Sequence, residues 1–143
     1  MIHEYINEVC RILGITAPEV SNDTSNFKSK TTMEQCSSNG KTIYIAKANK
    51  FTPDYMFAIA HELRHVWQIR TNPDLYLGDY KPVGELSVED YNNQLAELDA
   101  NAFGAIIMAN LFGVKPLWNN LSQSKIDNIN AIAPDVVKTL SVA

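Results

Sequence analysis

Residues 53–70 are the part of the sequence that limits the fold of this chain most strongly. Thr52 is a good helix N-cap and Pro53 suits the first helical position, so together they predict a helix start. Pro73 predicts the end of the helix, because a residue before proline avoids the helical conformation. Apolar side chains occupy most of the circumference between these limits, which is typical of a buried helix. They are Met56, Phe57, Ile59, Ala60, Leu63, Val66 and Trp67.

The same helix contains the pattern H-E-x-x-H, formed by His61, Glu62 and His65. Histidines at positions i and i+4 lie one turn apart on one helical face, so both imidazoles can reach one metal ion. Zinc accepts imidazole nitrogen and prefers four ligands. Glu62 lies beside the metal without having to bind it, where it can take a proton from an attacking water. The alternative reading is two solvent-facing histidines on an ordinary amphipathic helix.

A carboxylate should complete the site, because the chain's one remaining histidine is His3, at the far N-terminal end. We expect a second long helix over residues 88–112, which offers Glu97 and Asp99. Positions i and i+2 of a helix point about 200° apart, so only one of the two can face the metal. The face of Glu97 also carries Asn101, whose side chain can bond to a ligating histidine. We therefore favour Glu97 as third ligand and keep Asp99 as the alternative.

A β-hairpin is expected over about residues 31–46. Its strand-like stretches are 31–36 and 41–46, and Asn39-Gly40 between them is a strong turn signal. The second stretch, which contains Ile45, is a candidate edge strand along which an extended peptide could add.

Helices and loops account for the rest of the chain, which predicts an α+β domain with a small antiparallel sheet packed against helices. No internal repeat or linker divides residues 1–143, so we expect a single domain. The further helices are expected over residues 2–13, 122–131 and 134–141, and the loops over 20–32 and 71–86.

Composition excludes several classes of protein. A net charge of −4 without a basic patch argues against nucleic-acid binding. Two distant cysteines cannot form a disulfide framework. The N-terminal stretch lacks the basic and continuous apolar segments of a signal peptide, and the longest apolar run, residues 102–114, is too short to span a bilayer. We expect a cytoplasmic protein that does not bind membranes.

The expected second helix reads Glu97-Leu98-Asp99-Ala100-Asn101-Ala102-Phe103-Gly104. Together with the H-E-x-x-H helix, this element resembles the ImmA/IrrE-type metallopeptidase family, over roughly residues 40–108. The resemblance implies a gluzincin site, in which two histidines and a glutamate bind zinc, and a minimal zincin-like fold. Members occur in bacteria, phages and mobile elements, and some cleave or regulate repressor proteins. The triplet Val66-Trp67-Gln68 departs from the family pattern.

The leading hypothesis is a zinc-dependent peptidase with one zinc ion per chain and an intracellular protein or peptide as substrate, with a regulator or repressor protein as one candidate. Glu62 would act as general base, and the loop residues Tyr76 and Tyr80 are candidate donors to the oxyanion. A second hypothesis is a zinc-binding regulatory or interaction domain without peptidase activity. A third is a metal-free helical interaction module.

Overall fold

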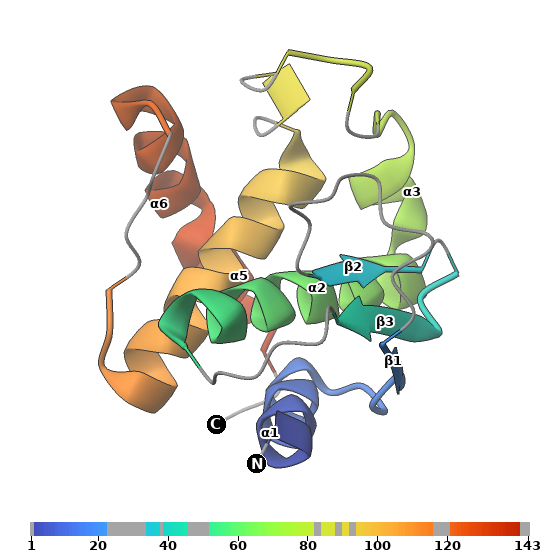
Figure 1. Cartoon of the computed structure of the whole chain (residues 1–143). Coiled ribbons are helices and arrows are strands. Elements are labelled where there is room, and N and C mark those ends of the chain that lie inside the picture. Colours follow the sequence, from blue (N-terminus) through green and yellow to red (C-terminus); the bar gives the residue numbers. More distant parts are fainter. Residues whose placement is uncertain are drawn as a thin grey trace.

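Helix α2 (Pro53–Thr71) crosses the middle of the molecule, and the other elements surround it (Figure 1). This computed structural model describes residues 2–22, 34–37, 39–45, 52–81, 84–87, 90–91, 94–115 and 121–140. The other elements are α1 (Ile2–Leu13), β1 (Glu19–Ser21), β2 (Glu34–Cys36), β3 (Thr42–Ile45), α3 (Pro73–Leu77), α5 (Leu95–Phe112) and α6 (Gln123–Lys138).

The limits of α2 follow the predicted signals. The Thr52 hydroxyl accepts a hydrogen bond from the Tyr55 N–H at 3.3 Å, which satisfies one of the free amides of the first turn. Asn72 ends the helix, and its side chain then caps α3 by accepting from the Leu75 N–H. The prediction of a helix over 53–70 is therefore confirmed. The predicted loop over 71–86 is wrong in part, because Asn72 and Pro73 start a new short helix as well as ending the old one.

The sheet has the strand order β1-β3-β2. Strands β2 and β3 pair antiparallel, with Glu34 opposite Ile45, as the hairpin predicted. Strand β1 pairs parallel with β3, so the sheet is mixed, and the expectation of a wholly antiparallel sheet is wrong. A three-residue strand in a polar stretch is too short to show an alternating pattern. Because β3 is the central strand, the idea that the strand of Ile45 is an edge open to a peptide is also wrong.

Helix α5 begins later than expected. Ser87 does accept a hydrogen bond from the Asp90 N–H at 3.1 Å, as a cap would, but the backbone of Gln94 is extended (ψ 144°), so α5 starts at Leu95 and not at 88. The Gln94 side chain explains the break, because it accepts from the Lys81 N–H at 2.6 Å and donates to the Lys81 carbonyl at 2.9 Å. The predicted end is confirmed, with Gly113 in the left-handed conformation at φ 65°.

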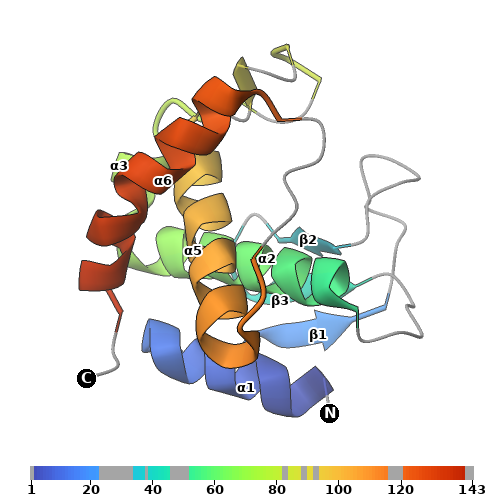
Figure 2. The ribbon, with the colours of Figure 1, turned by 90° about the vertical axis from the view of Figure 1, so that its left-hand side faces the viewer.

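The C-terminal segment forms one helix, α6, where two were expected on either side of Pro134. A proline inside a helix removes one hydrogen bond and costs about 3 kcal/mol. Burial of Ile129 and Val136, which flank the proline, offsets that cost. Figure 2 shows α6 lying along α5, on the side of the molecule opposite the sheet.

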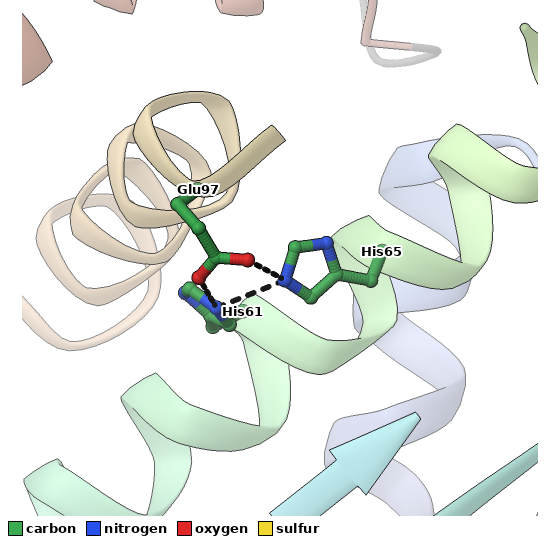
Figure 3. Close-up of side chains that lie close together, drawn as sticks. All are labelled: His61, His65 and Glu97. Carbon is green, nitrogen blue, oxygen red and sulfur yellow. Dashed lines mark hydrogen bonds and ion pairs between the residues drawn. The ribbon is translucent and has the colours of Figure 1, made fainter. Parts of the chain in front are cut away.

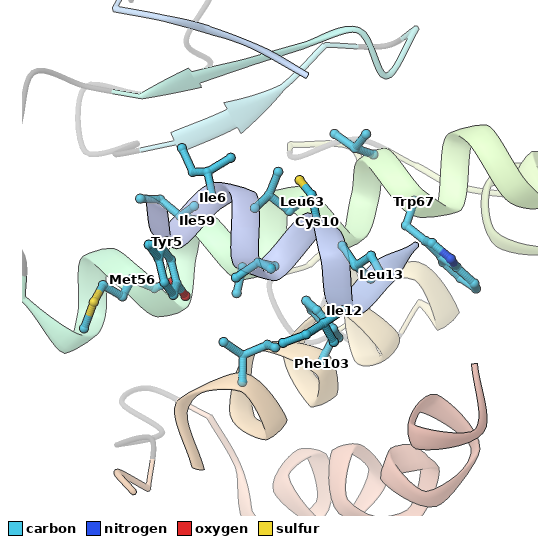
Figure 4. Packing of buried hydrophobic residues seen from close by; sticks show 14 of the residues in the cluster. Tyr5, Ile6, Cys10, Ile12, Leu13, Met56, Ile59, Leu63, Trp67 and Phe103 are labelled. Atoms are coloured by element: carbon cyan, nitrogen blue, oxygen red, sulfur yellow. The ribbon is translucent and has the colours of Figure 1, made fainter. Parts of the chain in front are cut away.

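The core lies where α1, the sheet and α5 meet α2. Ile6 and Leu13 of α1, Leu63 of α2 and Phe103 of α5 all belong to this core (Figure 4). Helix α5 is long and apolar enough to cross a membrane by length and composition, but half of it is buried inside this fold. Because α5 packs between α2 and α6, it is apolar on more than one face.

A glycine sets how closely α5 approaches α2. A Cβ atom added to Gly104 would lie 2.8 Å from the ring of Phe57, which is closer than real side chains come. The absence of a side chain at this position therefore allows the two helices to meet at short distance, and this close approach brings the first turn of α5 next to the H-E-x-x-H turns of α2.

Candidate metal centre

His61 and His65 on α2 and Glu97 in the first turn of α5 form one cluster (Figure 3). Their potential ligand atoms all lie within 4.8 Å of one another. The Glu97 carboxylate lies 3.2 Å from His61 Nε2 through one oxygen and 3.0 Å from His65 Nε2 through the other. The Glu97 side chain is 4% exposed and the two histidines 15% and 12%, so the cluster is largely buried and the histidines keep a small solvent-exposed fraction.

Asp99 lies away from this cluster. Its two carboxylate oxygens accept from Arg64, one from Nε at 2.7 Å and the other from the Nη2 nitrogen at 3.0 Å. Of the two acids that the sequence left in competition, the structure thus brings Glu97 to the histidines and pairs Asp99 with a buried arginine. The separation of about 200° expected for positions i and i+2 accounts for the difference.

Each histidine is held from behind by an amide side chain. His61 Nδ1 lies 2.8 Å from Asn101 Oδ1, which confirms the expected contact of Asn101 with a histidine of the motif. His65 Nδ1 lies 2.8 Å from Gln68 Oε1, a contact that the sequence reasoning missed. The available signal was the spacing, because residues i and i+3 of a helix are neighbours on one face.

This arrangement fits a cation in the cluster. Amide oxygens accept hydrogen bonds, so both Nδ1 atoms carry protons and both Nε2 atoms remain as the ligand atoms. Those two Nε2 atoms face each other at 3.1 Å with a carboxylate against both. Lone pairs held this close repel unless a proton or a metal ion lies among them. Two imidazoles and one carboxylate are the protein ligands of one kind of catalytic zinc site, in which water takes the fourth position.

The charges of the cluster are strongly coupled. Burial opposes the charge of Glu97, but the positive charge of His65 and hydrogen bonds from both histidines outweigh it and hold the pKa of Glu97 well below its usual range. Burial likewise opposes the charge of His65, and attraction to Glu97 outweighs it, raising the pKa of His65 to about 10. In the metal-free protein an imidazolium therefore balances the ionised carboxylate.

Glu62 lies next to the cluster on α2. Burial raises its pKa, against the opposing effect of His65 and His61, so its carboxylate is a better proton acceptor than an exposed one. The backbone N–H of Cys36 donates a hydrogen bond to it. That strand β2 reaches this carboxylate was not predictable from the sequence pattern.

Two tyrosine hydroxyls cover Glu97. The Tyr80 hydroxyl donates to Glu97 Oε2 at 2.9 Å and lies 2.9 Å from the Tyr91 hydroxyl. The Tyr91 hydroxyl is hydrogen-bonded to both the Tyr80 hydroxyl and the Glu97 carboxylate. Burial and the charge of Glu97 raise the pKa of Tyr91 to about 12, so it stays protonated. Tyr76, the other loop tyrosine expected near the site, lies instead against Trp67, with ring centroids 5.6 Å apart.

No family model, curated protein or solved structure matches this chain. Among the residues that the structure describes, His61, His65 and Glu97 are the one group of His, Cys, Asp or Glu side chains close enough to share an ion.

Proposed function

We propose that this chain is a zinc-dependent peptidase of the gluzincin type, with one zinc ion held by His61, His65 and Glu97. The observation that supports this most is the convergence of two Nε2 atoms and one carboxylate within 4.8 Å, next to a glutamate that is not needed as a ligand. A site that only binds metal has no use for Glu62. A zinc ion held by these three residues would supply a water of lowered pKa and polarise a substrate carbonyl, which is the chemistry that peptide hydrolysis needs.

Glu62 acts as the general base. It takes a proton from the water as the water attacks the scissile carbonyl, and it passes that proton to the amine that leaves. The raised pKa of Glu62 brings its proton affinity closer to that required near neutral pH. The bond from the Cys36 N–H helps to hold the carboxylate in place.

Tyr80 holds the Glu97 carboxylate in its ligating orientation, since its one proton is engaged at 2.9 Å by the same oxygen that faces His65. A role as oxyanion donor, which the sequence suggested for Tyr80, requires that bond to open first. Tyr91 supports the hydroxyl of Tyr80 from behind.

An extended peptide fits the outer edge of β2 better than β3. Ser37 N–H donates to Thr42 on the β3 side, and alternation along a strand directs the N–H of Cys36 outward, to Glu62. Among the described residues, β2 ends the strand order on this side of the sheet. Main-chain bonds along that edge would align a scissile bond with Glu62. Together with the resemblance described above, this makes a cytoplasmic regulatory or repressor protein the first substrate class to test.

The test has two stages. The metal content of the purified protein should be about one zinc per chain, lost in His65→Ala and kept in Glu62→Gln. Peptide libraries digested with wild type and with Glu62→Gln, and read by mass spectrometry, should show cleavage by the wild type alone. Absence of bound zinc, or equal cleavage by both proteins, refutes the proposal. Zinc with specific binding of a partner but no cleavage supports the regulatory alternative.

A further inference from the structure

Behind His65 lies a buried chain of hydrogen bonds that ends at an arginine. Gln68 donates through Nε2 to the Ala96 carbonyl at 3.0 Å and to Asp99 Oδ2 at 2.8 Å, and its Oε1 faces His65 Nδ1 at 2.8 Å. Asp99 Oδ2 also accepts from Arg64 Nε at 2.7 Å. Arg64 and Gln68 have no exposed surface, and Asp99 is 4% exposed.

The orientation of the Gln68 amide follows from its partners. A carbonyl and a carboxylate can only accept hydrogen bonds, so the side of the amide that faces Ala96 and Asp99 must be its NH₂ group. The oxygen is therefore directed at His65, because a flipped amide would place that oxygen against two groups that can only accept.

The orientation of Gln68 in turn fixes His65. An oxygen that only accepts requires a proton on Nδ1, so Nε2 is the nitrogen that remains for the metal. Figure 3 shows this Nε2 atom facing Glu97 while the other ring nitrogen points away from the cluster. Because Arg64 satisfies both oxygens of Asp99, the carboxylate cannot turn away from Gln68 without losing a bidentate ion pair.

We infer that Gln68 and Asp99 are positioning residues for the metal, acting in series: Arg64 orients Asp99, Asp99 orients Gln68, and Gln68 holds His65 with Nε2 toward the ion. This inference rests on the proposed function, and it gives Asp99 a role other than that of a ligand. It also explains why an arginine stands, without solvent exposure, inside the H-E-x-x-H motif.

The test is a double-mutant cycle on zinc affinity, with Gln68→Met, Asp99→Asn and their combination. Gln68→Met keeps the shape of the side chain and removes the acceptor, and it should weaken zinc binding by about 10- to 100-fold, as loss of a partner behind a ligand does. Asp99→Asn alone should weaken binding by about tenfold. In the Gln68→Met background, Asp99→Asn should have no further effect on zinc affinity, although it still lowers stability.

Tyr5→Phe is the matched control. It removes a buried hydrogen bond to the Met56 carbonyl, which takes no part in the hydrogen bonds around the histidines, and should lower stability without changing zinc affinity. All affinities are measured at a temperature at which each variant is folded. Unchanged zinc affinity in folded Gln68→Met overturns the inference, and additive effects of the two substitutions overturn the serial arrangement.

Nitrogen-15 NMR of the wild-type imidazoles decides the matter if Gln68→Met does not fold. The zinc-loaded protein should show His65 with a proton on Nδ1 and metal on Nε2; metal on Nδ1 overturns the inference. The metal-free protein separates this inference from the proposed function. If the wild type binds no zinc, the proposed function fails. A slowly exchanging Nδ1 proton on His65 that exchanges faster in Asp99→Asn still supports the hydrogen-bond chain. Absence of such a proton overturns the hydrogen-bond chain.

Discussion

Breaking the Arg64–Asp99 pair should be among the most damaging single changes outside the metal cluster. The side chains are 0% and 5% exposed, so water cannot replace a lost partner. Removing one member of such a pair leaves a buried charge and costs about 3–5 kcal/mol. Asp99→Leu should cost an amount near the upper end of this range. It removes both Asp99 oxygens that accept from the Arg64 guanidinium, and it removes one of the two acceptors of Gln68. Arg64→Met belongs near the lower end, because Asp99 keeps the bond from Gln68.

The double variant Arg64→Met/Asp99→Leu should be more stable than either single variant. Replacing both charges by apolar side chains removes the desolvation cost, which makes such exchanges nearly neutral in other buried pairs. The two largest losses that remain are the contact of Arg64 over the Trp67 ring, with 3.7 Å from the guanidinium carbon to the ring centroid, and one hydrogen bond of Gln68. Each of these costs about 1 kcal/mol. We therefore expect a net loss of about 2 kcal/mol in the double variant.

Urea unfolding of the four proteins, with a chelator present so that zinc binding does not contribute, measures these differences. Losses of about 3–5 kcal/mol correspond to a lowering of the melting temperature by about 10–15 °C for a chain of this size. If the double variant loses as much as the two single variants together, Arg64 and Asp99 do not act as a pair, and the reasoning is refuted.

Three further predictions concern the metal cluster and the helix contact. Zinc binding near pH 7 should release a proton from His65, because its pKa is about 10 in the metal-free protein. The heat of zinc binding measured by calorimetry should therefore depend on the ionisation enthalpy of the buffer. A binding heat that is the same in all buffers contradicts this. The stability of the metal-free protein should decline as pH rises from 6.5 towards about 10, because His65, with its raised pKa, loses its stabilising proton over that range. It should also decline as pH falls below 4.5, because Glu97, with its lowered pKa, becomes protonated. Melting temperatures measured with a chelator that stay constant over both pH ranges contradict this. Gly104→Ala should cost about 1–3 kcal/mol by pressing a methyl group against Phe57, whereas Ala105→Gly, beside it on the less buried side, should cost about 1 kcal/mol or less; equal losses contradict the close approach.

The parts of the fold that the sequence predicted are those with strong local signals. Thr52 and Pro53 start α2, Gly113 ends α5, and Asn39-Gly40 turns the hairpin, each through the conformation of a few adjacent residues. The predictions were wrong where a contact distant in sequence determines whether an element forms or where it begins. Strand β1 exists because β3 is available beside it, and α5 starts at Leu95 because the Gln94 side chain binds the backbone of Lys81. No local pattern carries that information.

The candidate site shows the same division. His61, Glu62 and His65 come from one helix, so their spacing alone placed them together, and Glu97 followed from the need for a carboxylate. Gln68, the acceptor behind His65, stayed unnoticed because its role depends on Asp99 and on the Ala96 carbonyl, both on α5. A glutamine three residues after a histidine is common, and only the packing of α5 against α2 distinguishes this one.

Glu97 and Asp99 together determine how α5 sits on α2. They point to opposite flanks of α5, and both find partners on α2, Glu97 at His61 and His65 and Asp99 at Arg64. The line of contact between the helices, where Ala100 and Gly104 lie, therefore runs between two polar anchors. A shift of α5 by one turn along α2 would leave both carboxylates buried without partners, and each such group costs several kcal/mol. Asp99 thus faces Arg64 and keeps Glu97 in register with the histidines.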